Sequence, residues 1–80
     1  MSNINLVFTY QGNNITMQCQ PYEKLSDIYR RFSTKIQRNV GDFNFFLNAR
    51  EVPPCNKTLE QLQVSNFCKF DAVEKNVIGA

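Results

Sequence analysis

The sequence predicts an α+β domain of two layers, in which one long helix packs across a mixed sheet of four to five strands. Two stretches that alternate between apolar and polar residues flank a turn at 11–14. A stretch with helical spacing of apolar residues follows at 24–41, and further strand-like stretches lie at 43–47 and 67–73. An amphipathic helix must bury its apolar stripe, and the apolar face of a sheet offers the surface for it.

Residues 4–10 and 15–20 are predicted to form a β-hairpin. Gly12 and Asn13 in the turn "QGNN" tolerate a positive φ, and Pro21 ends the second strand because it cannot donate to a sheet. Alternation places one apolar set on the side of the core: Ile4, Leu6, Phe8, Ile15, Met17 and Cys19.

The helix is predicted from its apolar stripe, which runs through Leu25, Ile28, Phe32 and Ile36 at intervals of three, four and four residues. Lys24 is a poor N-cap for this helix. Asn39 or Gly41 suits the left-handed position that ends many helices.

The stretch "DFNFFLN" at 42–48 raises a question about its outer side. Alternation sends Phe43, Phe45 and Leu47 to the core, whereas Phe46 shares the opposite, polar side with Asn44. A large aromatic side chain on the solvent side of a strand is a candidate contact for a partner.

The rest of the chain is predicted to contain short elements and one more strand. A tight turn at 48–51 leads to a brief return strand at Val52. A proline-rich loop, one turn of helix and a last strand follow at 53–57, 58–64 and 67–73. Because a helical crossover separates the first and last strands, they should pair in parallel. We expect one domain at 1–75 and a flexible C-terminal tail at 76–80.

The predicted core is an apolar set drawn from all of these elements. We expect the following to be mostly buried: Leu6, Ile15, Met17, Leu25, Ile28, Phe32, Phe45, Leu47, Leu59, Val64 and Phe70.

Composition argues against several classes of function. The net charge of +2 is too weak to indicate a nucleic-acid partner, and no apolar run has the ~20 residues of a membrane helix. The chain has no histidine, and its three cysteines lack metal-binding spacing, so we expect no metal, no cofactor and no enzyme activity. An odd cysteine number without a secretory signal fits a reducing compartment, the cytoplasm or the nucleus.

Four motifs in order resemble the ubiquitin-like family, whose fold is the β-grasp: "GNNITMQCQP", "LSDIYRRF", "FFLNAREV" and "TLEQLQV". The resemblance covers residue 4 to about residue 73. It implies a non-catalytic protein-interaction domain or a modifier-like protein, monomeric, with receptors or enzymes of the ubiquitin pathway as partners.

The resemblance also implies a binding patch on the outer face of the sheet. Phe46 matches the third-strand position of ubiquitin's apolar patch. The predicted protein-binding set around it is Val7, Tyr10, Phe46 and Lys69, with Arg50 at the rim.

Two departures from ubiquitin bear on conjugation. Arg50 replaces a chain-linking lysine, and the tail ends in Ile78, Gly79 and Ala80, whereas modifiers of the family end in Gly-Gly. Either Ala80 is removed, or the chain is a piece of a longer precursor, or conjugation does not occur.

An alternative is a Ras-binding or Ras-associating domain, which shares this fold and holds an acidic GTPase through a basic edge. Arg30, Arg31 and Lys35 would supply the basic helix face. The second strand argues against this alternative, because its outward residues Thr16, Gln18 and Gln20 are uncharged.

Overall fold

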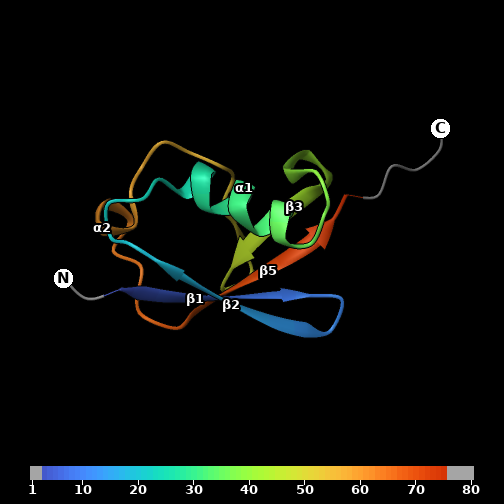
Figure 1. Cartoon of the computed structure of the whole chain (residues 1–80), viewed down its shortest axis with the longest axis horizontal. Helices are drawn as coiled ribbons and strands as arrows, with labels where there is room; N and C mark the ends of the chain where they lie inside the picture. Colours follow the sequence, from blue (N-terminus) through green and yellow to red (C-terminus); the bar gives the residue numbers. More distant parts are fainter. Residues whose placement is uncertain (1–2, 76–80) are drawn as a thin grey trace.

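A computed structural model describes residues 3–75 of the chain. Figure 1 shows one long helix lying over a twisted sheet. In chain order the elements are β1 (Ile4–Tyr10), β2 (Asn13–Cys19), α1 (Leu25–Lys35), the 3₁₀ helix η1 (Val40–Asp42), β3 (Phe43–Leu47), β4 (Arg50–Glu51), α2 (Leu59–Leu62) and β5 (Cys68–Glu74).

The five strands form one mixed sheet in the order β2-β1-β5-β3-β4. The central pair, β1 and β5, is parallel, as predicted from the crossover between them. The other pairs are antiparallel. Strands β2 and β4 are therefore the two edges of the sheet. Helix α1 covers one of its faces (Figure 1).

The β1–β2 hairpin turns one residue earlier than predicted. Tyr10 pairs with Asn13, so the two loop residues are Gln11 and Gly12, with φ of 49° and 80°. Two successive positive φ values define a type I′ turn, whose twist matches that of the flanking strands. Asn13 therefore belongs to β2 rather than to the turn.

Helix α1 follows Lys24, as the sequence indicates, but ends earlier than predicted. It begins at Leu25, and Lys24 makes no side-chain cap. The free N–H groups of Leu25 and Ser26 instead donate to the carbonyls of Lys57 and Cys55, both at 3.0 Å. A segment remote in sequence thus caps this helix.

At its C-terminal end α1 stops at Lys35. The left-handed residue there is Gln37, with φ of 60°, rather than Asn39 or Gly41. Residues 40–42 form the separate 3₁₀ turn η1, which leads directly into β3.

Helix α2 is a single turn held by reciprocal capping. The Thr58 hydroxyl accepts from the Gln61 N–H at 3.1 Å, and the Gln61 side chain accepts from the Thr58 N–H at 3.0 Å. This capping box fixes the start of the element. Gln63, with φ of 56°, ends it.

The core is rich in aromatic side chains. Most of the predicted set is buried, but Ile15, Leu47 and Val64 lie at its margin and are only partly covered. Phe8, Cys19 and Phe43, which alternation also sends to the core, are buried as well, and so are Tyr29 and Ala72. Phe8 occupies the centre, with ring centroids 4.6 Å from Phe32 and 5.4 Å from Phe70.

Tyr29 is the main residue that the predicted helix stripe missed. It is fully buried, and its ring stacks on Phe45 with centroids 3.8 Å apart. Its position, four residues after Leu25 and three before Phe32, does fit the stripe. The hydroxyl donates to the Val52 carbonyl at 2.8 Å, which ties the helix to the strand-like segment beyond β4.

We expect Ile28→Ala to lower the free energy of unfolding by ~2–5 kcal/mol, because Ile28 is fully buried between helix and sheet. The matched control is Arg30→Ala on the exposed side of the same helix, which should change stability by at most ~0.5 kcal/mol. Chemical denaturation of both variants checks this. Equal stabilities would show that the buried face of α1 is assigned wrongly.

We expect Tyr29→Phe to lower the free energy of unfolding by ~0.5–1.5 kcal/mol, because it leaves the Val52 carbonyl without its donor while keeping the ring. Tyr22 is 67% exposed, so Tyr22→Phe should leave stability almost unchanged. Thermal denaturation of the two variants side by side is the measurement. Equal melting temperatures would mean that the hydroxyl contributes nothing.

Candidate protein-interaction surface

The outer face of the sheet, opposite α1, carries Phe46 on β3, between β5 and the short edge strand β4. Phe46 is partly buried and alternates along β3 with the buried Phe45. Its partner across β5 is Asp71, and its partner across β4 is Glu51. Because paired residues in adjacent strands point to the same face, one carboxylate flanks the ring on each side.

Apolar and basic side chains complete this surface. Val7 on β1 pairs with Lys69 on β5, so these two residues of the predicted set lie side by side, and Lys69 is two residues before Asp71 on the same face of β5. Val73, the next outward residue of β5, is 48% exposed. We call this set of six residues the Phe46 face: Val7, Phe46, Glu51, Lys69, Asp71 and Val73.

Tyr10 does not belong to the Phe46 face, contrary to the sequence prediction. It is the last residue of β1 and shares the core side with Phe8. Its ring packs edge-on against Phe32 and Phe43, with centroids 6.2 and 5.5 Å away. The resemblance to ubiquitin's patch suggested the outer face, but Tyr10 lies two residues after the inward Phe8 in the predicted strand 4–10, so alternation sends its side chain to the helix side.

The Tyr10 hydroxyl is part of a polar cluster at the end of β5. The Glu74 carboxylate accepts from Arg38 at 3.2 Å, from Gln11 at 3.1 Å and from Tyr10 at 3.4 Å. The Arg38 guanidinium also lies over the Phe43 ring, 5.4 Å from its centroid. These contacts join the β1–β2 turn, the segment after α1 and the end of β5.

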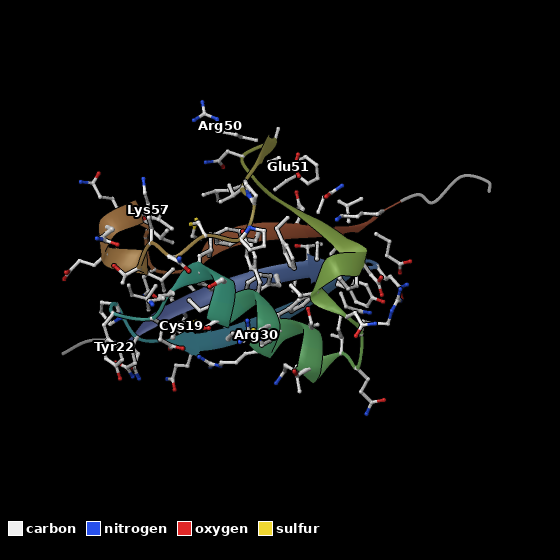
Figure 2. All side chains as sticks on the ribbon, turned by 90° about the horizontal axis from the view of Figure 1, so that it is seen from above. Cys19, Tyr22, Arg30, Arg50, Glu51 and Lys57 are labelled. Atoms are coloured by element: carbon white, nitrogen blue, oxygen red, sulfur yellow. The ribbon has the colours of Figure 1, made fainter. Side chains whose placement is uncertain are left out.

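Arg50 also lies away from the Phe46 face. It pairs with Leu47, so it shares the helix side of the sheet, whereas its neighbour Glu51 pairs with Phe46. Figure 2 shows Arg50 at the free edge of the sheet, projecting away from the body of the domain. The sequence prediction missed this because a two-residue strand offers too little alternation to read.

The opposite edge of the sheet forms a basic groove between β2 and α1. A hollow of about 780 Å³ lies there, lined by Thr16, Gln18 and the cationic residues Arg30, Arg31 and Lys35. Arg31 pairs with Glu23 and donates to the Gln18 carbonyl at 3.0 Å. Arg30 pairs loosely with the Asp27 carboxylate, 3.7 Å away.

The thiol of Cys19 lies in the core, and that of Cys68 packs against it. Burial raises the pKa of Cys19 to about 11, and burial also raises the pKa of Cys68. Both thiols are therefore protonated at neutral pH. Among residues 3–75, no group of three or more Cys, Asp or Glu side chains is placed to hold a metal ion, and no helix is long and apolar enough to span a membrane.

The fold with one helix across a sheet ordered β2-β1-β5-β3-β4 is the β-grasp arrangement. No protein-family model and no curated protein sequence matches the chain. Among solved structures, a ubiquitin of Caldiarchaeum subterraneum matches with a TM-score of 0.81 at 15% identity, covering 98% of this chain and 100% of that one.

The solution structure of a ubiquitin-like domain from an Arabidopsis thaliana protein matches with a TM-score of 0.83 at 11% identity, covering 100% of this chain and 85% of that one. The predicted ubiquitin-like fold is therefore confirmed. The predicted tail, including Ile78, Gly79 and Ala80, lies outside the described residues.

We expect Glu74 to titrate below its ordinary carboxyl pKa of 4.5, because hydrogen bonding and charge from Arg38 favour its ionised form. A lowered folded-state pKa contributes stability above the ordinary value, which is lost as the pH falls through the lower value. The measurement is an NMR titration of the Glu74 carboxyl carbon. Arg38→Gln should raise this pKa toward 4.5, whereas Arg30→Gln should not. A Glu74 that titrates at its ordinary value in the wild type would contradict the cluster.

Proposed function

We propose that this protein is a non-catalytic, ubiquitin-like protein-interaction domain that a partner recognises through the Phe46 face. The observation that carries the proposal is the position of Phe46, whose partly exposed ring lies on the face of the sheet that α1 leaves uncovered. The other phenylalanines of β3, Phe43 and Phe45, are buried against the helix. The core therefore does not need Phe46 in that position.

The energetics of an aromatic contact support this role. Burying one aromatic or aliphatic side chain stabilises a complex by ~1.5–3 kcal/mol, so Phe46 and Val73 together can dominate the binding free energy of a small interface. Binding in the micromolar range corresponds to about −8 kcal/mol. A partner that covers the ring and the two valines of this face would reach that range only with some polar contacts as well.

The charges around Phe46 indicate what those polar contacts are. Glu51 and Asp71 flank the ring and make no ion pair among residues 3–75, and Lys69 is the only cation in the set. A partner that brings a basic side chain over the ring would meet both carboxylates. Binding should therefore weaken as the salt concentration rises.

The chemistry of the remaining residues supports a non-catalytic role. The chain lacks histidine, and the pKa values of the buried Cys19 and the partly buried Cys68 are raised. Within residues 3–75 the three cysteines are free, which fits our proposal of a reducing location, the cytoplasm or nucleus. We propose that the domain acts as a monomer in a ubiquitin-related pathway.

A second candidate function is the holding of an acidic protein, such as a small GTPase, in the basic groove. Because the β1–β2 hairpin is closed by a two-residue loop, the N–H and C=O groups of Thr16 and Gln18 point away from β1, toward the open edge of β2. An extended acidic segment could pair there beside Arg30 and Lys35. The existing bonds of Arg31 to Glu23 and to the Gln18 carbonyl reduce this capacity, so we rank the groove second.

We expect Phe46→Ala to weaken binding of a captured partner at least tenfold while lowering the free energy of unfolding by no more than ~1 kcal/mol, since the ring is outside the core. Calorimetric titration and thermal denaturation measure the two effects. The matched control is the double variant Arg30→Gln and Lys35→Gln on the basic groove.

The two candidates predict opposite patterns for these variants. Recognition through the Phe46 face requires loss of affinity in Phe46→Ala and retention in the groove double variant. The reverse pattern would assign the function to the basic groove. Loss of stability in Phe46→Ala comparable to that of Ile28→Ala would show that the ring is structural.

A further inference from the structure

A second apolar site lies on the helix side of the sheet, between the β3–β4 hairpin and the segment that follows α2. It is a hollow of about 390 Å³ with Leu25 and Phe70 among its lining residues, both of them fully buried core residues. This volume is at the small end of the range of ~300–1,000 Å³ for ligand pockets. We call it the Leu47 hollow.

Its remaining apolar lining is only partly covered. Leu47 comes from β3, Val52 from the segment after β4, and Leu62 and Val64 from the end of α2 and beyond. All four of these side chains pack at the margin of the core with part of their surface open. The free energy falls when an apolar group displaces water from aliphatic surface that is held open in this way.

The local chain geometry explains why the core does not close over this hollow. Strand β4 has two residues and is followed after Val52 by Pro53 and Pro54, which cannot donate to a sheet. Helix α2 has four residues and ends at the left-handed Gln63. Both neighbouring elements therefore stop before they supply a side chain that covers the space.

Arg50 gives the Leu47 hollow a charge preference. It is the only charged residue that lines the hollow, and it makes no ion pair within residues 3–75. Glu51, the nearest acidic residue in sequence, points to the opposite face through its pairing with Phe46. The guanidinium, which projects freely in Figure 2, remains available to a carboxylate from outside.

We propose that the Leu47 hollow binds a leucine-sized aliphatic side chain of a protein partner, within a segment whose next residue is an Asp or Glu that pairs with Arg50. The apolar lining sets the preference for the aliphatic side chain, and the single unpaired cation sets the preference for the acid. The Leu47 hollow is separate from the Phe46 face. Alternation along the β3–β4 hairpin sends the Leu47–Arg50 pair to the helix side of the sheet and the Phe46–Glu51 pair to the outer side.

The test uses the full 80-residue protein labelled with nitrogen-15 and a blocked peptide, acetyl-Ser-Ala-Leu-Asp-Ala-Ser-amide. Titration should shift the backbone amide signals of Leu47, Arg50, Val52 and Val64, with dissociation constants from high micromolar to millimolar for so small a contact. Shifts centred on Phe46 and Asp71 instead, or no shifts at millimolar peptide, would overturn the proposal.

Peptide changes separate the two parts of the recognition. Replacing Leu by Ala should abolish the shifts, and replacing Asp by Asn should weaken binding about fivefold, as expected for one partly exposed charged pair. Equal binding of a peptide with Lys in place of Asp would overturn the charge assignment. A peptide that ends in a free Leu carboxylate should bind more weakly than the internal sequence, and tighter binding of that peptide would overturn the choice of an internal segment.

Protein variants complete the test. Arg50→Gln should weaken binding of the Asp peptide about fivefold. It should not change binding of the Asn peptide, because that peptide already lacks the carboxylate that pairs with Arg50. The matched control Lys57→Gln, on an exposed lysine that does not line the hollow, should change neither. An equal effect of the two variants would reduce Arg50 to general surface charge and overturn the proposal.

Two further variants separate peptide binding at the Leu47 hollow from partner binding at the Phe46 face. Phe46→Ala should leave peptide binding unchanged, so a negative result at either surface does not count against the other. Val52→Phe should fill the hollow and abolish peptide binding while the protein stays folded, as judged from its amide spectrum. Unchanged binding in a folded Val52→Phe protein would show that the peptide binds elsewhere.

Discussion

The packing of one aromatic cluster between a single helix and a single sheet face determines the rest of this structure. Tyr29 and Phe32 of α1 reach down onto Phe8, Phe45 and Phe70 of three adjacent strands. One helix covers only one face of a sheet, so the second face stays open to water in residues 3–75. This open face is the one on which we propose that a partner contacts Phe46.

The β3–β4 hairpin divides its residues between two surfaces. Phe46 and Glu51 point outward, whereas Leu47 and Arg50 point to the helix side. The turn between them consists of Asn48 and Ala49 with φ of 53° and 65°, a type I′ turn that fixes this register. Ala49 takes the left-handed conformation at some cost, since it has a Cβ that glycine lacks. A slip of one residue would exchange the two surfaces completely.

Much of the fold follows from local pattern in the sequence. Alternation in β1, β2, β3 and β5 was sufficient to assign inward and outward residues, and the spacing of Leu25, Ile28 and Phe32 gave the buried side of α1. Tyr29 was missed because a residue that carries a hydroxyl is easily assigned to the surface. Its hydroxyl is satisfied by the Val52 carbonyl, and no local pattern predicts that contact.

The candidate surfaces were less predictable than the fold because they depend on register between strands. Alternation along 67–73 is enough to put Asp71 on the outer side of β5, but only the pairing of Phe46 with both Asp71 and Glu51 shows that carboxylates flank the ring. Arg50 was assigned to the wrong surface for the same reason, because its side depends on its pairing with Leu47 in the two-residue strand β4. Tyr10 was assigned to the outer face from the resemblance, although alternation along 4–10 already places it on the side of Phe8.

The low identity to proteins of the same fold shows why surface chemistry must be derived from this chain itself. Structures that share 11–15% of their residues with it superimpose with TM-scores above 0.8. Apolar periodicity and a few turn residues are therefore enough to keep the fold, because many apolar side chains of similar volume can fill such a core. Outward positions are free of that requirement. The phenylalanine flanked by two acids on one face and the arginine beside an open aliphatic hollow on the other are therefore properties of this chain's own residues, and our proposals about partners depend on them rather than on the shared fold.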